Sequence, residues 1–317
     1  MKIIGFFRKF TALFITLFML IGVSSNGAPA HTVLNEDECR LCISVISDSH
    51  IEGNNLPRYN VFGRILKDAK NTSFGNDAAV FLGDNTMNGQ NIESLLFYGA
   101  VEQAKIADNH IVVCGNHDVG NGEGDYDKLR DRFLGFNNGV LGMDIEKPYY
   151  YKVINGYYFI TLAPECLTVY ELPISMEQLE FLDETLSLAA AEGKPAFVCA
   201  HHPWDDAVLY DPETEEYDYD DNTLHDILTK YDNVFYLSGH THMPCFEGWT
   251  FNEYEGVKEV NLPRCTELAG ADDHEIFGGT GYTVQLEVYD NEVVGRVRNS
   301  YTGQWDDELE YHFSLVK

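Results

Sequence analysis

The sequence predicts an α/β fold in which two β-sheets pack face to face with helices on the outside. Segments with the apolar character of buried strands alternate with segments of helical periodicity through most of the chain, and after Gly239 only strand patterns follow. Such an order suits two packed sheets with helical outer layers. No Pro/Gly/Ser-rich linker or internal repeat divides residues 31–317, so we expect a single domain there.

The first part of the chain is expected to alternate between strand and helix. Strands are predicted at 43–46, 78–82 and 111–114. Apolar residues from Val61 to Ala69 recur at helical spacing, which predicts a helix between the first two strands. Further helices are expected over 91–107 and 125–134.

The second part begins with a predicted hairpin over 149–153 and 157–162, because Asn155-Gly156 is a strong two-residue turn signal. Ser175, with Gln178 three residues later, has the pattern of a capping box at the start of a helix. The remaining predicted elements are a helix near 223–231 and strands at 196–200, 234–238, 258–262, 283–289 and 293–298.

Residues 1–30 have the layout of a secretory signal peptide. Basic residues within the first nine positions precede an apolar run from Phe10 to Val23, and Ala28-Pro29-Ala30 follows. The run of about 14 residues is shorter than the roughly 20 that a membrane-spanning helix needs. We therefore expect a secreted protein, extracellular or periplasmic, without a stable membrane span; an uncleaved anchor is the alternative.

The chain is strongly acidic. Its formal net charge of −30 becomes −33 when the three positive charges of the predicted signal peptide are removed (−30 − 3). Such a surface repels nucleic acid and anionic membranes at long range, so we expect no nucleic-acid partner. Nothing in the sequence specifies an oligomeric state.

The cysteine count is odd, and seven cysteines cannot all pair within one chain. Cys39 and Cys42 have the CxxC spacing of a local disulfide or of half a zinc site, and no second CxxC pair is present. Cys114 and Cys199 fall inside apolar strand segments, so they are expected to be buried small hydrophobic residues.

Side chains that bind metal ions follow five of the predicted strands, at the edge where α/β sheets place ligands. They lie in the stretches Asp48-Ser49-His50, Gly83-Asp84-Asn85, Gly115-Asn116-His117-Asp118, His201-His202-Pro203 and Gly239-His240-Thr241-His242. This set without cysteine suits Mn, Zn, Fe or Ni, and seven ligands suit two divalent metal ions that share one carboxylate. Such a pair binds phosphoryl oxygens and lowers the pKa of a bridging water, so that hydroxide attacks in line without a protein nucleophile.

The same residues resemble five sequence blocks of the calcineurin-like metallophosphoesterases. The blocks are Asp48-x-His50, Gly83-Asp84, Gly115-Asn116-His117-Asp118, His201 and Gly239-His240-x-His242. The resemblance implies a four-layer αββα sandwich of two mixed sheets and a metal-dependent hydrolase of small phosphate mono- or diesters.

The resemblance also implies a role for each residue. One metal ion would be bound by Asp48, His50 and His242, the other by Asn116, His201 and His240, and Asp84 would bridge them. His117 would stabilise the transition state or protonate the leaving oxygen. Asp118 is expected to support His117 rather than to bind metal.

Two positions distinguish this chain from one group of the family, the purple acid phosphatases. Purple acid phosphatases have a metal-bound tyrosine where this chain has Met87, and they lack the histidine that His50 supplies, so an Fe(III)-tyrosinate centre is not expected. The chain resembles secreted or cyclic-nucleotide-type phosphodiesterase members of the family more closely. Within His201-His202-Pro203 the preferred ligand is His201, because the family's histidine usually lies two residues before such a proline; His202 is the alternative.

The acidic run from Asp205 to Asp221 is expected to be a solvated loop, and its alternative is a lid beside His201.

The alternative to an enzyme is a secreted binding module with a structural or vestigial metal site. The complete ligand set favours the enzyme, because a vestigial site should have lost at least one member.

Overall fold

The computed structural model describes residues 33–35, 37–72, 76–266 and 281–316. The predicted signal peptide lies outside these residues. Within the described ranges, no helix is both long enough and apolar enough to cross a membrane.

The first sheet has six strands in the order β15-β14-β13-β1-β2-β3. Its parallel half consists of β1 (Leu41–Ile46), β2 (Ala78–Phe81) and β3 (Asn109–Val112). Its antiparallel half consists of β13 (Tyr282–Val288), β14 (Glu292–Asn299) and β15 (Gln304–Ser314), and β13 pairs with β1. The parallel half places the carboxyl ends of β1, β2 and β3 at one edge.

The second sheet also has six strands, in the order β11-β12-β10-β7-β5-β4. Its strands are β4 (Tyr151–Ile154), β5 (Tyr157–Thr161), β7 (Ala196–Cys199), β10 (Val234–Ser238), β11 (Phe251–Tyr254) and β12 (Val257–Asn261). The central strands β5, β7, β10 and β12 run parallel, whereas β4 and β11 are antiparallel edge strands.

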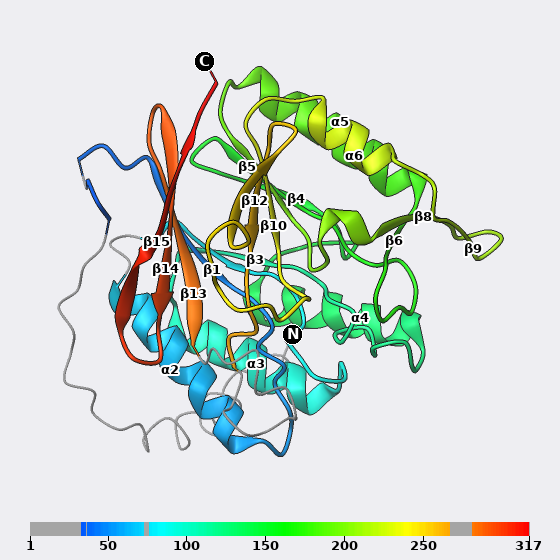
Figure 1. The fold of residues 1–317 in the computed structure, drawn as a ribbon. Helices are drawn as coiled ribbons and strands as arrows, with labels where there is room; N and C mark the ends of the chain where they lie inside the picture. The colour runs from blue at the N-terminus through cyan, green and yellow to red at the C-terminus, as the bar shows by residue number, and fades with distance from the viewer. Residues whose placement is uncertain (1–32, 36, 73–75, 267–280, 317) are drawn as a thin grey trace.

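The two sheets pack face to face, and helices cover their outer faces (Figure 1). The helices are α2 (Leu56–Thr72), α3 (Asn91–Ala104), α4 (Tyr126–Phe136), α5 (Met176–Ala191) and α6 (Thr223–Thr229). The apolar outer residues of β1, β2 and β3 pack against α2, α3 and α4, and those of β5, β7 and β10 pack against α5 and α6. The predicted four-layer αββα sandwich is therefore confirmed.

An aromatic row crosses the core between the sheets. Phe159, Phe197 and Phe235 lie side by side on β5, β7 and β10, with ring centroids 5.0 and 5.3 Å apart. Phe313 of β15 meets Phe235 at 5.3 Å from the opposite sheet. All four side chains are fully buried, so this row packs β7 and β10, which precede ligand loops, against β5 and the opposite sheet.

A third sheet, β6-β8-β9, was not predicted. It is formed by β6 (Leu172–Ile174), β8 (Ala207–Asp211) and β9 (Glu216–Asp218), and the short helix η2 (Trp204–Asp206) precedes β8. The interpretation of Asp205–Asp221 as a loop is therefore wrong for much of its length. Alternate residues of β8 are buried, which an acidic composition conceals, and the β8–β9 hairpin projects from the body at the right of Figure 1.

Of the two local signals, the hairpin turn is confirmed and the capping box at Ser175 is not. The hairpin turn is as predicted, with Asn155 at φ +53° and Gly156 at φ +81°. Ser175 caps α5 by accepting a hydrogen bond from the Gln178 amide, but the Gln178 side chain binds the Ala163 backbone and does not complete a capping box. The reciprocal box occurs instead at the start of α3.

All seven cysteines are unpaired. Cys42, Cys114, Cys199 and Cys265 are buried, and Cys39 is half-buried beside β1. No disulfide joins Cys39 to Cys42, and neither belongs to a group of potential metal ligands found among the described residues.

Candidate metal centre

The predicted ligands lie at the carboxyl ends of strands from both sheets. Asp48 and His50 follow β1, Asp84 follows β2, and Asn116 follows β3. The ligands from the second sheet are His201 after β7, and His240 and His242 after β10. Backbone hydrogen bonds join neighbouring loops, from His50 N to Asp84 O (2.8 Å) and from Gly239 N to His201 O (2.9 Å). The sandwich therefore brings five separate loops to one place.

Four side chains converge on one point near β1. His50 Nε2 lies 3.2 Å from His242 Nε2, 3.5 Å from Asp48 Oδ1 and 3.4 Å from Asp84 Oδ2. His242 Nε2 lies 3.1 Å from Asp48 Oδ1. Two imidazole nitrogens and two carboxylate oxygens at these separations surround a space that fits a divalent cation.

A second group lies beside the first and shares Asp84 with it. Asp84, His201 and His240 place ligand atoms within 4.8 Å of one another. The Nε2 atom of His201 is buried and lies 3.1 Å from Asp84 Oδ2. The Oδ1 atom of Asn116 is buried without a hydrogen-bond partner among the described residues. Such an orphaned acceptor is costly unless a cation satisfies it, which supports a second metal position.

Hydrogen bonds from their other atoms set the orientation of Asp48, Asp84 and His201. Asp48 Oδ2 accepts from Ser47 Oγ (2.5 Å) and from the His240 amide (3.2 Å), so Oδ1 faces the histidines. Asp84 Oδ1 accepts from the His117 amide at 2.9 Å. His201 Nδ1 donates to the Leu82 carbonyl at 2.7 Å, so Nε2 is the ring nitrogen that faces Asp84.

The backbone at the ligands is unusual. Asp48, His50, Asp84, His240 and His242 all have φ between +41° and +63°, in the left-handed region that side chains disfavour. Left-handed residues other than glycine cost free energy and are retained where the surrounding structure demands them. Five of the seven predicted ligands are thus held in strained loops.

Glycines next to the ligands allow the loops to approach closely. A Cβ atom at Gly239 would collide with Ser47 Oγ and Asp48 Oδ2, and one at Gly115 would collide with the backbone and carboxylate of Asp84. These two glycines are therefore required by the position of the carboxylates, whatever their own φ.

Opposite charges inside the centre hold the carboxylates ionised. Burial opposes ionisation of Asp48 and Asp84, but His201 and the other histidines outweigh it and hold the pKa of both carboxyls well below the usual value. His201 is raised in turn to a pKa of about 9, because Asp84 and Asp48 overcome the effect of burial. Burial lowers the pKa of His50 to about 3 and of His240 to about 4, so these imidazoles are neutral and able to bind metal.

His202 lies outside both groups. Its ring is fully buried, tilted against the His240 ring at 4.2 Å, and neither ring nitrogen has a hydrogen-bond partner among the described residues. Burial and the neighbouring His240 and His201 hold its pKa well below the usual value. Of the two adjacent histidines, the structure brings His201 to the shared carboxylate.

The prediction that Asp118 supports His117 is wrong. Asp118 accepts hydrogen bonds from Gly115, Asn85 and Thr86, whereas His117 Nδ1 donates to the carbonyl of Met87 at 2.7 Å. The turn of the chain after Asn116 directs the Asp118 carboxylate under the Asp84 loop and away from the imidazole. Asp118 therefore joins two loops of the centre.

Two buried arginines near the centre were not identified from the sequence. Arg58, in α2, donates from Nη1 to the His50 carbonyl at 3.3 Å and pairs with Glu52. Arg264 is 8% exposed, and its charge adds to burial in lowering the pKa of His50. Neither lies next to a ligand motif, and no local pattern marks them.

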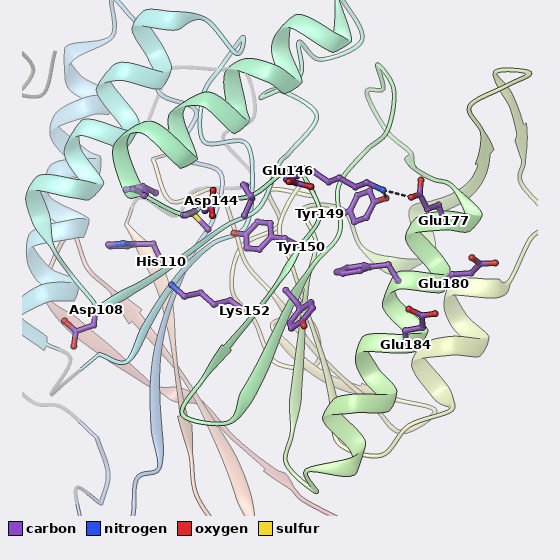
Figure 2. A pocket seen from close by; sticks show the side chains of 17 residues that line it. Asp108, His110, Asp144, Glu146, Tyr149, Tyr150, Lys152, Glu177, Glu180 and Glu184 are labelled. Carbon is purple, nitrogen blue, oxygen red and sulfur yellow. Dashed lines mark hydrogen bonds and ion pairs between the residues drawn. The ribbon is translucent and has the colours of Figure 1, made fainter. Parts of the chain in front are cut away.

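A cavity of about 810 Å³ lies apart from these residues, between β3, β4, α5 and the segment before β4 (Figure 2). Tyr149 and Tyr150 contribute to its wall, with Glu177, Glu180 and Glu184 along α5. None of the predicted ligands lines it. The cavity is therefore separate from the predicted metal ligands.

Comparison with known proteins agrees with this geometry. The model of a family described as calcineurin-like phosphoesterase matches residues 43–244, which span all five ligand loops. The chain belongs to the calcineurin-like phosphoesterases. As a member, it is a hydrolase that acts on phosphoester bonds, and its centre fits two divalent metal ions.

Solved structures resemble this phosphoesterase in fold. A dimetal phosphatase from Danio rerio is 15% identical with a TM-score of 0.59, and the match covers 88% of this chain and 100% of that one. A purple acid phosphatase from yellow lupin (Lupinus luteus) seeds is 16% identical with a TM-score of 0.51, and the match covers 90% of this chain and 55% of that one. No curated protein matches the phosphoesterase.

Proposed function

We propose that this phosphoesterase hydrolyses small phosphate mono- or diesters at two divalent metal ions. Asp48, His50 and His242 would hold one ion, and Asn116, His201 and His240 the other. The observation that carries the proposal is the position of Asp84, whose Oδ2 lies 3.4 Å from His50 Nε2 and 3.1 Å from His201 Nε2. One oxygen between the two histidines is what a bridging ligand requires.

Divalent ions held by these residues would supply Lewis acidity, which would offset the charge of phosphoryl oxygens and lower the pKa of water. Mn, Zn, Fe and Ni are all compatible with the oxygen and imidazole ligands. The side chains of the protein determine from which side a substrate reaches the centre. His242, with its side chain 32% exposed, and His117, with 15%, are accessible from solvent, whereas Asp48, His50 and His201 are buried. A substrate would therefore approach from the side of His242 and His117.

The role we assign to His117 is proton transfer to the leaving oxygen. Its Nδ1 is held by the Met87 carbonyl, so Nε2 points toward the centre, 3.9 Å from Asp84 Oδ2. The distance leaves His117 outside the ligand group but within reach of a phosphoester bound to it.

The alternative of a binding module with a vestigial site is less well supported. The orphaned acceptor on Asn116, and the left-handed backbone at five ligands, cost stability that a purely structural domain has no reason to retain. Both features suit a centre that is completed by metal ions.

The experiment is a hydrolysis assay of the metal-free protein reconstituted separately with Mn²⁺, Zn²⁺, Fe²⁺ and Ni²⁺. Substrates are p-nitrophenyl phosphate and bis(p-nitrophenyl) phosphate, and Asp84→Asn serves as the matched variant. We expect turnover only with metal and a loss of most activity in Asp84→Asn with the fold retained. Equal activity of Asp84→Asn at full metal occupancy would refute the shared carboxylate, and no turnover with any ion would favour the binding module.

We also propose that the protein is secreted, on the evidence of the N-terminal sequence pattern alone. The mature chain should begin between Ser25 and His31. N-terminal sequencing of the protein from its native host tests this. Retention of Phe10–Val23 would replace secretion with membrane anchoring.

A further inference from the structure

We propose that Asn121 is a positioning residue that decides which atom of the Asn116 side chain faces the metal ions. The inference rests on the proposed role of Asn116 as a ligand. An amide side chain presents an oxygen lone pair in one orientation and an NH₂ group in the other, and only the oxygen binds a cation. A neighbouring group must therefore hold the Asn116 amide in the orientation that turns its oxygen toward the metal ions.

Asn121 accepts the hydrogen bond that holds the Asn116 amide in this orientation. The Nδ2 atom of Asn116 donates a hydrogen bond to Asn121 Oδ1 at 2.8 Å. The Oδ1 atom of Asn116 is left buried and without a partner among the described residues. With the Asn121 amide oriented as observed, reversing the Asn116 amide would set its oxygen against the oxygen of Asn121 and turn its NH₂ group toward the ligands. The observed orientation is thus the one in which Asn121 accepts.

The backbone of Asn121 is held by the same residue. Its amide donates to the carbonyl of Asn116 at 2.7 Å, so Asn121 is bound to Asn116 at two points. Asn121 has φ +51°, between Gly120 at +101° and Gly122 at +80°. Asparagine tolerates this left-handed conformation better than most residues, which explains how a side-chain acceptor is carried at this tight turn.

The substitutions that test the inference must respect this backbone. Asn121→Gly keeps the left-handed conformation free of strain and removes the acceptor. Asn121→Asp also tolerates the conformation and keeps an acceptor at the same place. Asn155→Gly is the matched control, because Asn155 has φ +53° in the hairpin between β4 and β5 and is not among the predicted ligand loops.

The experiment titrates Mn²⁺ into the metal-free full-length protein and its variants by calorimetry, with thermal unfolding of the metal-free forms as a check on the fold. Loss of a partner that orients a ligand typically weakens metal binding by about 10–100-fold. We expect this loss at one of two Mn²⁺ sites in Asn121→Gly, affinity equal to or tighter than wild type in Asn121→Asp, and no change in Asn155→Gly.

Two outcomes would overturn the inference. The first is that Asn121→Gly binds both Mn²⁺ ions as wild type does. The second is that Asn121→Gly and Asn121→Asp weaken binding equally, which would indicate a purely structural turn. If Asn121→Gly does not fold, Asn121→Ser, whose side chain is too short to reach Nδ2, takes its place. A wild-type stoichiometry below two would count against the proposed dinuclear function itself, and is read separately from the contrast between variants.

Discussion

The Nδ1 atom of His117 lies 2.7 Å from the main-chain carbonyl oxygen of Met87. A carbonyl oxygen only accepts hydrogen bonds, so Nδ1 carries a hydrogen and Nε2 is the atom that faces the metal centre. Because the partner is an uncharged carbonyl, the imidazole is oriented without a carboxylate beside Nδ1. This geometry leaves Nε2 to exchange a proton with a substrate.

Substitution of His117 by alanine should separate catalysis from metal binding. We expect His117→Ala to keep both metal ions and to lower kcat by about 10²–10⁴, the range for loss of a general acid. An ester with a good leaving group, such as p-nitrophenolate, needs little protonation, whereas an alkyl alkoxide needs it strongly. The loss should therefore be larger for alkyl phosphoesters, measured by released phosphate.

Two results would revise this role. An equal loss for aryl and alkyl esters would indicate that His117 stabilises charge rather than donates a proton. Loss of one metal equivalent, measured by elemental analysis, would mean that the ligand assignment around Asn116 is wrong.

Substitution of Asp118 by asparagine should loosen the Asp84 loop. Its Oδ2 accepts from Asn85 N, Asn85 Nδ2 and Gly115 N at 3.0–3.2 Å, and its Oδ1 accepts from the amide and hydroxyl of Thr86 at 2.8–2.9 Å. In Asp118→Asn one of these oxygens becomes an NH₂ group that faces hydrogen-bond donors. We expect the free energy of unfolding to fall by about 1–3 kcal/mol, measured in urea. Asp127→Asn, at an exposed position of α4, is the control and should change little.

Substitution of Gly239 by alanine should displace a ligand. The added Cβ would collide with Ser47 Oγ and Asp48 Oδ2, both rigidly held, so Asp48 must move. We expect Gly239→Ala to bind metal at least about 10-fold more weakly, by analogy with loss of a ligand's support. Gly63→Ala, where a Cβ meets nothing within 4 Å, is the control for any change in backbone entropy. Unchanged Mn²⁺ affinity in Gly239→Ala would show that the loop is more yielding than the packing indicates.

Asp206 should contribute a pH dependence of stability outside the metal centre. Burial, with smaller effects of Asp205 and Glu171, raises the pKa of Asp206 to about 6. The folded state therefore binds more protons than the unfolded state between the ordinary aspartate value near 4 and about 6, and stability rises as pH falls through that window. At pH 7 the ionised carboxylate is a cost to the folded state.

Asp206→Asn removes this ionisable group. We expect it to stabilise the protein at pH 7.5 by roughly 1 kcal/mol, a figure discounted because Asp206 remains partly in contact with solvent. At pH 4.5, where the folded wild type is protonated at this position, the gain should shrink. The difference between wild type and variant in urea unfolding at the two pH values is the measurement, and a gain that grows toward acid pH would contradict the sign.

The sequence by itself determined the α/β class, the five ligand loops and the family. Buried strands and amphipathic helices impose different periods on apolar residues, so β1, β2, β3, β7 and β10 were all visible as local patterns. The ligands were visible because metal chemistry restricts residue types: carboxylate, amide and imidazole at strand ends have few other reasons to recur in that order.

The tertiary structure alone decided what each of these residues contacts. Strand β15 was missed because most of its 11 residues are exposed and polar, and it is held by pairing with β14 rather than by its own pattern. Asp118 was expected to support His117 but binds Thr86, which is distant in sequence, and Asn121 binds the Asn116 amide. Local periodicity reports burial, whereas hydrogen-bond partners and left-handed backbone depend on how loops from two sheets meet, which no single stretch of sequence encodes.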